Sequence, residues 1–446
     1  MAELTVLTEG RRVMGSAAPE PDLVAAGYAE SEWLIAGDAD SYRAVSTPAD
    51  GRWEVTEAGT SPFATRIVVR RPVVPAAFSG TAVVEWLNVS SGEDASPDWT
   101  YLSEEIVRAG HLYVAVSAQH VGVEGGEATV TTAGPQSRGL KGRKSPRYQA
   151  LHHPGDAYCY GIYTEVLQAV RSGQAPFDGL VVDRVIAVGE SQSAYALTTY
   201  VNAIQPRTRA ADAFLVHSRG GAPLPLGERG KAIELNQVRY AEPVLLREDL
   251  GVPVLVVETE TDLLSPRINY LPARQDDSAF LRVWEVAGTA HADRFQVGEF
   301  EKFLGCPDPI NTGQQVYVLR AGLRALVAWL VDGVAAPTAD RLELKGPDAF
   351  VTDALGNACG GVRTPVVDAA VSCLSGLAAP EASLICSLFG RTLPVAPEVL
   401  AARYADVDAY LASYAAATDA AIAAGFVCAE DRDAVLAEAR PEVLAP

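Results

Sequence analysis

Short apolar runs alternate with segments of helical spacing through the middle of the chain. Runs rich in Val, Ile and Leu predict buried strands at residues 81–92, 112–118, 183–188, 213–217, 254–258 and 281–286. The first of these runs continues into a polar loop. Apolar residues with the spacing of one helix face lie between or after them, at 98–109, 155–171, 192–203 and 314–331. Strands that alternate with helices are typical of an α/β protein, with a mostly parallel central sheet flanked by helices.

The two ends of the chain have different patterns. Residues 1–80 are rich in turn formers and in short β-type runs such as 66–71 (RIVVRR), which predicts a β-rich N-terminal region. Residues 337–446 lack strong strand signals and end in Ala-rich helical runs at about 397–424 and 430–440. We expect this part to be a helical C-terminal extension that packs on the core and not an independent domain.

The predicted organisation is therefore one core domain followed by the extension. The core is expected over residues 1–336. Its alternation of strands and helices is interrupted at about 221–252 by a segment that is rich in Pro and Gly at first and mixed later. We expect this segment to form a short cap-like insertion.

The charge of the chain argues against two classes of partner. It has 36 basic and 56 acidic residues and a net charge of −20, whereas nucleic acids and anionic membranes are bound by clustered Lys and Arg. No apolar stretch reaches about 18 residues, so no transmembrane helix is expected. The start, MAELTVLTEGRR, lacks the basic and then apolar pattern of a signal peptide. The cytoplasm is the expected compartment, and a homo-oligomer is left open.

The cysteines give no metal signal. The chain has six cysteines: Cys159, Cys306, Cys359, Cys373, Cys386 and Cys428. None of them forms a CxxC pair, so a zinc or iron–sulfur site is not expected. In a cytoplasmic chain they are expected to be buried thiols. A disulfide within the part after residue 350, or one that joins this part to Cys306, is left open.

The most informative segment is VIAVGESQSAYAL, residues 185–197, in which a buried strand turns sharply at Gly189 and enters a helix. This is the context of a nucleophile elbow, usually G-x-S-x-G, whose serine lies on a strained turn with its hydroxyl exposed. Small residues must flank that serine because the strand and the helix pass close together. Ser193 replaces the last Gly here and is still small. We predict Ser191 as a nucleophile, with a plain structural turn as the alternative.

A serine hydroxyl needs an adjacent base, and the base needs an acid that orients it. In this context the chain order is serine, acid, histidine, with the histidine in a loop after the last strand. His291 fits this order because its loop, GTAHAD, follows the strand at 281–286. His217 also comes after Ser191, but it ends a strand that comes too early. We predict His291 as the base.

The acid is expected after the penultimate strand, at 254–258. Asp262 begins the loop there, and its short side chain suits an orienting role. Glu260 is the alternative acid, whereas Glu258 is expected to lie within the strand. The alternative for Asp262 is a structural role as a turn or helix-capping residue.

The tetrahedral intermediate of acyl transfer needs an oxyanion hole. One donor is expected to be the backbone N–H of Gln192, directly after the nucleophile. The other is expected in the loop after the strand at 81–86, where the N–H of Val89 is the first choice and that of Asn88 the second. No Walker A pattern or HExxH motif occurs. No cofactor or metal is therefore expected.

Several of these segments together resemble a known family. The likeness rests on EWLNVSSG (85–92), HPGDAYCYGIY (153–163), GESQSAYAL (189–197), VHSRGG (216–221), WEVAGTAHAD (284–293) and ALGNACGGVRTP (354–365). They are similar to the bacterial and fungal "alpha/beta hydrolase domain" proteins, a branch of the α/β-hydrolase superfamily, over most of the chain. The resemblance implies the α/β-hydrolase fold and a Ser–acid–His hydrolase, in which Ser191 and His291 match the nucleophile and the base. Asp262 is carried over as the acid.

We therefore expect a serine carboxylesterase that cleaves a small-molecule ester through an acyl-enzyme. One alternative is an acyltransferase, or an amide or thioester hydrolase, that uses the same residues. The other is a hydrolase fold kept as a non-catalytic binding protein. Acyl and alcohol specificity do not follow from the sequence.

Overall fold

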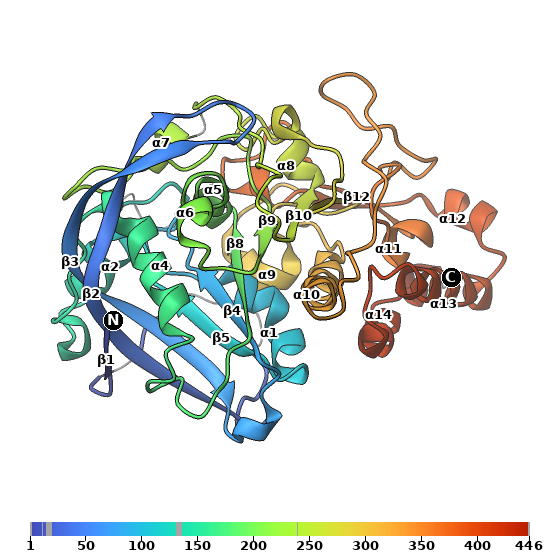
Figure 1. The fold of residues 1–446 in the computed structure, drawn as a ribbon. Helices are drawn as coiled ribbons and strands as arrows, with labels where there is room; N and C mark the ends of the chain where they lie inside the picture. The colour runs from blue at the N-terminus through green and yellow to red at the C-terminus, as the bar shows by residue number, and fades with distance from the viewer. Residues whose placement is uncertain (1, 11, 15–19, 131–135, 239, 445–446) are drawn as a thin grey trace. The chain divides into compact units, whose positions relative to one another are not determined.

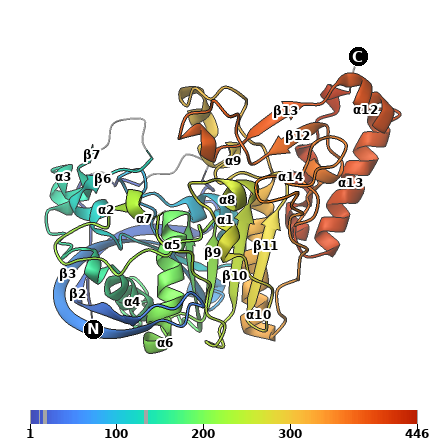
Figure 2. The ribbon, with the colours of Figure 1, turned by 90° about the horizontal axis from the view of Figure 1, so that it is seen from above.

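The computed structural model describes residues 2–10, 12–14, 20–130, 136–238 and 240–444. They form two compact units (Figures 1 and 2). Unit 1 comprises residues 1–254 and 272–280, and unit 2 comprises 255–271 and 281–446. The domain division predicted from the sequence, 1–336 and 337–446, stays a prediction.

The described strands of unit 1 form a sheet with antiparallel and parallel parts. The strand order is β1-β2-β3-β5-β4-β8-β9. Antiparallel pairing joins β1 (Glu3–Val6), β2 (Tyr28–Ser46), β3 (Glu54–Pro72) and β5 (Leu112–Val116). Parallel pairing joins β5, β4 (Thr81–Trp86), β8 (Arg184–Glu190) and β9 (Ala213–His217). Every residue of β4, β5 and β9 is buried, as expected for parallel strands covered on both faces.

The N-terminal β region differs from the sequence prediction in the length of its strands. Instead of short runs, β2 and β3 each extend over 19 residues and pair along almost their whole length (Figure 1). The β-type run 66–71 lies in the largely buried second half of β3, whereas the first half of this strand is largely exposed. That exposed half has no regular alternation of apolar residues, and the pairing with β2 defines it.

Helices of unit 1 pack on this sheet. Contacts join α1 (Pro97–Arg108) to β4 and β8, α4 (Cys159–Ala169) to β2, and α5 (Gln192–Thr199) to β8 and β9. Shorter elements are α2 (His120–Glu124), β6 (Gly126–Glu127), β7 (Gln136–Ser137), α3 (Gly139–Gly142), α6 (Gln205–Thr208) and α7 (Leu235–Val238). The predicted insertion at 221–252 consists mostly of loop around α7.

A buried ion-pair cluster lies beneath the N-terminal strands. The guanidinium of Arg66, fully buried, reaches Asp94 Oδ2 at 2.6 Å and Glu32 Oε1 at 3.3 Å. Burial by itself lowers the pKa of Arg66, but the two carboxylates outweigh it and raise this pKa above its usual value. Arg66 lies on β3, Glu32 on β2 and Asp94 in the loop after β4, so the cluster connects these three segments.

Unit 2 contains β11 (Leu281–Val286) and almost all of β10 (Val254–Thr259), which are neighbours in the sheet. The short helix α8 (Glu260–Leu264) follows β10 directly, and α9 (Arg294–Val297) follows the loop after β11. The amphipathic helix predicted at 314–331 is α10 (Gln315–Asp332), which ends at Gly333 in the left-handed conformation.

The C-terminal part of unit 2 is less helical than predicted. It holds α11 (Pro365–Asp368) and the antiparallel pair β12 (Ser372–Ser375) and β13 (Arg391–Pro394), which the sequence pattern did not indicate (Figure 2). The run predicted at 397–424 is split into α12 (Pro397–Arg403) and α13 (Val407–Ala423), because Asp406 caps a new helix by accepting from Ala409 N–H. The last α-helix of the described residues is α14 (Arg432–Ala437).

Candidate active site

The turn between β8 and α5 holds Ser191 in an unusual conformation. Its φ is 56° and its ψ is −117°, although it is not a glycine. Its N–H donates to the backbone oxygen of His217 at 2.9 Å, which ties the turn to the end of β9. A non-glycine residue in such a region costs about 1–3 kcal/mol and persists only where the surroundings impose it. The strained turn expected of a nucleophile elbow is therefore present at Ser191.

Small residues flank this turn for a steric reason. A Cβ added to Gly189 would lie 3.0 Å from Ser193 Cβ and 3.1 Å from Leu197 Cδ1. Ser193 is fully buried against it, and its hydroxyl has no hydrogen-bond partner among the described residues. Ser193 thus takes the place of the usual Gly by being small and not by donating a hydrogen bond.

The N–H groups of Val89 and Asn88, the oxyanion donors predicted in the loop after β4, already have partners. The N–H of Val89 donates to Gln192 Oε1 at 3.1 Å, and the N–H of Asn88 donates to Ala95 O at 2.9 Å. The carboxamide oxygen of Gln192 therefore holds the position on Val89 N–H that a substrate oxygen would need.

Further hydrogen bonds connect the turn to β4 and to the loop after it. The side-chain N–H of Gln192 donates to Gln119 Oε1, which also accepts from Trp86 Nε1 at 3.0 Å. Asn88 Nδ2 donates to the backbone oxygen and to Oε2 of Glu190, both at 3.1 Å. Glu190 and Gln192 stand on either side of Ser191, so the loop after β4 is fixed to both neighbours of the predicted nucleophile.

In unit 2, Asp262 and His291 form a hydrogen-bonded pair. Asp262 Oδ1 lies 2.6 Å from His291 Nδ1, and both side chains are buried. Asp262 Oδ2 accepts from the N–H and the hydroxyl of Thr259, each at 2.7 Å. Burial raises the pKa of Asp262, but the charge and hydrogen bond of His291 and the bonds from Thr259 outweigh it and hold this pKa below its usual value. Asp262 is thus an ionised carboxylate oriented at the imidazole.

Glu260, the alternative acid, has different partners. Oε1 accepts from Gly288 N–H at 2.6 Å, and Oε2 accepts from Gly376 N–H at 2.8 Å. Burial raises the pKa of Glu260 to about 7, although these two hydrogen bonds lower it. Among the described contacts of Glu260, both hydrogen bonds go to the backbone, whereas Asp262 contacts the imidazole.

A second buried acid–histidine pair was missed by the sequence analysis. His217 Nδ1 lies 3.1 Å from Asp98 Oδ1, and both side chains are fully buried. Next to it, Glu85 accepts from the N–H groups of Asp98 and Trp99 at 3.1 and 2.9 Å. Burial and the nearby Asp98 raise the pKa of Glu85 well above its usual range. This network underlies the elbow, because the backbone of His217 accepts the Ser191 N–H.

The disulfide that the sequence left open joins Cys306 to Cys386, with a Cα–Cα distance of 5.5 Å. Among the cysteines outside this disulfide, Cys159 and Cys428 are buried, whereas Cys359 and Cys373 are partly exposed. Among the described residues, no group of three or more His, Cys, Asp or Glu side chains could hold a metal ion. In the same residues, no helix is both long enough and apolar enough to cross a membrane.

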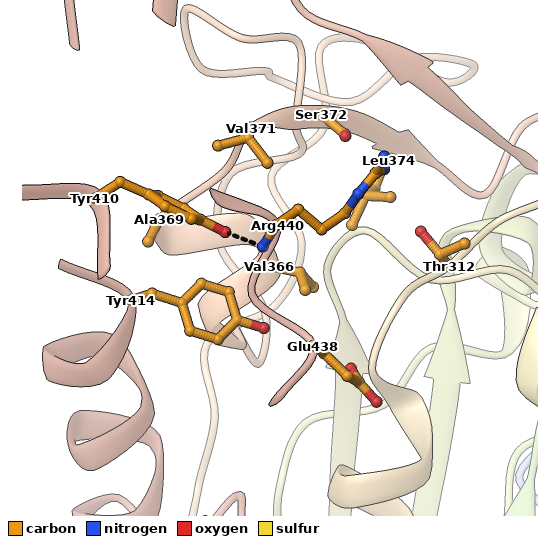
Figure 3. Close-up of a pocket in the computed structure, with 10 residues that line it drawn as sticks. All are labelled: Thr312, Val366, Ala369, Val371, Ser372, Leu374, Tyr410, Tyr414, Glu438 and Arg440. Carbon is orange, nitrogen blue, oxygen red and sulfur yellow. Dashed lines mark hydrogen bonds between the residues drawn. The ribbon is translucent and has the colours of Figure 1, made fainter. Parts of the chain in front are cut away.

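Figure 3 shows a small cavity in unit 2, between the C-terminal helices and β12. Its volume of about 30 Å³ is enough for about one water molecule. It is lined by Thr312, Val366, Ala369, Val371, Ser372, Leu374, Tyr410, Tyr414, Glu438 and Arg440. None of the predicted site residues is among them, and the cavity is too small for an ester substrate.

Comparison with known proteins gives a family for nearly the whole chain. The family model described as "Alpha/beta hydrolase domain" matches residues 2–437. No curated protein matches. Similar solved structures include a putative dienelactone hydrolase from Klebsiella pneumoniae (12% identity, 66% of this chain and 98% of that chain, TM-score 0.31). Others are a glucuronoyl esterase from Solibacter usitatus (10%, 61% and 71%, 0.30) and esterase 2 from Thermogutta terrifontis (13%, 67% and 96%, 0.30). At these TM-scores the likenesses do not bear on function.

Proposed function

The chain belongs to the alpha/beta hydrolase domain family, and we propose that it is a serine hydrolase that cleaves a small-molecule carboxylic ester. The observation that carries this proposal is the left-handed, strained backbone of Ser191 at the junction of β8 and α5. Such a turn presents a serine hydroxyl for attack, and strain of this kind is concentrated at functional sites. The oriented Asp262–His291 pair supplies the second requirement, a base for that hydroxyl.

In the proposed mechanism, Ser191 Oγ attacks the ester carbonyl and His291 Nε2 takes its proton. His291 then gives the proton to the leaving alcohol, and water cleaves the acyl-enzyme with the same base. Asp262 holds the imidazole with its proton on Nδ1 and stabilises the imidazolium. The mechanism requires His291 to reach Ser191 during the reaction.

The backbone N–H groups of Gln192 and Val89 are the proposed oxyanion donors. Because Gln192 Oε1 accepts from Val89 N–H, its carboxamide must turn away when the substrate oxygen binds. The loss of one such donor typically lowers the rate by about 10²–10³-fold. In the proposed mechanism, the substrate oxygen displaces the Gln192 carboxamide oxygen from Val89 N–H.

The test is hydrolysis of p-nitrophenyl acetate and butyrate by the parent and by Ser191→Ala, His291→Ala and Asp262→Asn. We expect the first two changes to abolish turnover and Asp262→Asn to lower kcat by about 10³–10⁴-fold. Ser193→Ala is the matched control, because it removes a hydroxyl from the same turn, and it should stay within about twofold. Turnover that survives Ser191→Ala would refute the mechanism.

The alternatives are outcomes of the same test. Faster product release with excess alcohol, and formation of a new ester, would identify an acyltransferase. If the parent does not cleave the two esters, a fluorophosphonate probe decides: labelling of Ser191 indicates a serine hydrolase with a narrower substrate range. Absence of labelling indicates a non-catalytic binding protein and overturns the proposal.

The cytoplasmic location stays a prediction, and so does the absence of a cofactor. The Cys306–Cys386 disulfide bears on the location, because such bonds are rare in the cytosol of mesophiles. To measure whether the bond forms in the cell, cells would be lysed directly into denaturant that contains an alkylating reagent. The number of alkylated cysteines then shows whether Cys306 and Cys386 are free thiols or bonded to each other.

A further inference from the structure

The loop that carries His291 is bonded to a peptide of the C-terminal part of the chain. Gly376 donates its N–H to Glu260 Oε2 at 2.8 Å, and its carbonyl oxygen accepts from Thr261 Oγ1 at 2.5 Å. Glu260 and Thr261 are the two residues directly before Asp262 in α8. The backbone N–H and C=O of Gly376 thus both bond to the helical turn that carries the proposed catalytic acid.

The same two side chains continue to the loop after β11. Glu260 Oε1 accepts from Gly288 N–H at 2.6 Å, and Thr261 Oγ1 accepts from the backbone N–H of His291 at 3.1 Å. All of these groups are buried. The backbone of His291 is therefore connected through one hydroxyl to Gly376, while its imidazole is connected to Asp262.

Packing at Gly376 leaves no room for a side chain. A Cβ added there would lie 2.4 Å from Thr289 O, 2.5 Å from Glu260 Cβ and 2.6 Å from Thr261 N. None of these atoms is the end of a flexible side chain, so either α8 or the His291 loop would have to shift. The close approach of three backbones is what requires glycine here.

Other contacts hold segment 375–390 on the same loop. Asn311 Nδ2 donates to the oxygens of Gly288 and Ser375, both at 3.1 Å, and Ala292 N–H donates to Leu388 O at 3.0 Å. The Cys306–Cys386 disulfide and a small hydrophobic cluster around Phe389 lie at the far end of the segment. Segment 375–390 therefore contacts the loop on both sides of His291.

We propose that segment 375–390, through Gly376, Glu260 and Thr261, positions the Asp262–His291 pair for catalysis. This inference rests on the proposed function and extends it to the C-terminal part of the chain. Glu260, Thr261 and Gly376 are positioning residues that act through Asp262 and His291. Their hydrogen bonds set the distance between the first turn of α8 and the His291 backbone, and the Asp262–His291 hydrogen bond depends on that distance.

The first test is Gly376→Ala, with Gly37→Ala as the matched control. Gly37 also has an ordinary φ, and a Cβ there meets only van der Waals contacts at 3.5 Å. We expect Gly376→Ala to lower kcat by about 10–100-fold, as misplacement of a catalytic group does, with KM within about twofold. Its pH profile should shift because the base is oriented differently. Gly37→Ala should match the parent. A parental kcat and pH profile in Gly376→Ala would overturn the proposal.

Thr261→Val and Thr261→Ser test the proposal if Gly376→Ala does not fold. Thr261→Val keeps the shape and removes the hydroxyl, whereas Thr261→Ser keeps the hydroxyl. We expect Thr261→Val to lower kcat by about 10-fold and Thr261→Ser to restore it to within about twofold. Equal activity of the two variants would show that the hydroxyl has no positioning role.

A readout independent of turnover separates this inference from the proposed function. The Nδ1–H proton of His291, bonded to Asp262, should give a downfield ¹H NMR resonance that is absent in His291→Gln. We expect this resonance to move or broaden in Thr261→Val and to stay in place in Thr261→Ser. If Ser191→Ala keeps its turnover, the proposed function fails but this resonance still decides the positioning role. An unchanged resonance in Thr261→Val overturns it.

Discussion

The buried carboxyl of Glu260 should impose a pH dependence on the stability of unit 2. Its side chain is 2% exposed, and burial raises its pKa from 4.5 to about 7. Hydrogen bonds from Gly376 and Gly288 and the charge of Arg363 oppose this rise but do not cancel it. We consider Glu260→Gln, which keeps the shape of the side chain and removes its titration.

The direction follows from the number of protons bound in each state. In the unfolded chain Glu260 loses its proton near pH 4.5, whereas in the folded protein it keeps the proton up to about pH 7. Between these values the folded state binds more protons, so the free energy of unfolding falls as the pH rises. This contribution is fully present below pH 4.5 and is lost as the pH passes about 7. At 1.36 kcal/mol per pKa unit, the loss is about 3 kcal/mol.

The assay is urea unfolding at intervals between pH 4 and pH 8, followed by tryptophan fluorescence. The free energy of unfolding of Glu260→Gln minus that of the parent should rise by about 3 kcal/mol over this range. The subtraction cancels the titration of the groups that do not depend on Glu260. Glu381→Gln, which removes an exposed carboxylate, should follow the parent. Parallel pH curves for the parent and Glu260→Gln would refute the reasoning.

Two further predictions concern buried charge and the disulfide. Arg66→Met removes the guanidinium between two buried carboxylates. Glu32 keeps its ion pair with Arg147, whereas Asp94 keeps no cation among the described ion pairs. The change should lower the free energy of unfolding by about 3–5 kcal/mol in urea titrations, and a change below about 1 kcal/mol would contradict this. Cys386→Ser opens the link to Cys306 across 80 residues, for which the loop-entropy model gives a loss of about 4.5 kcal/mol relative to the oxidised parent, and equal unfolding midpoints would contradict it.

The sequence predicted well those strands whose residues are nearly all buried, because their burial shows as a continuous apolar run. β9 and β11 begin and end where their apolar runs do, at Ala213–His217 and Leu281–Val286, because every one of these residues but Arg282 is buried. The lengths of β2 and β3 could not be predicted in the same way. The end of β2 (43–46) and most of the first half of β3 are exposed, and the pairing between the two strands defines them.

The same distinction applies to the candidate site. Ser191 was predicted from a strand, a turn and a helix that are contiguous in sequence, and its backbone has the expected strain. The partners of the predicted oxyanion donor could not be predicted, because Gln192 is 103 residues from Val89. Gly376 is still harder to find, since it lies 115 residues from Thr261 and one glycine among 38 carries no pattern. Non-local hydrogen bonds of this kind have no local signature.

The choice between Glu260 and Asp262, however, has a local signature that the sequence analysis did not use. Thr259 and Asp262 are the first and last residues of TETD and form a capping box at the start of α8. The box holds Asp262 Oδ2 on Thr259 and leaves Oδ1 for His291. Successive side chains of a helix are about 100° apart, so Glu260, two residues earlier, faces another direction and meets Gly288 and Gly376 instead. A Thr three residues before a carboxylate, directly after a buried strand, therefore favours that carboxylate as the oriented acid over its neighbour.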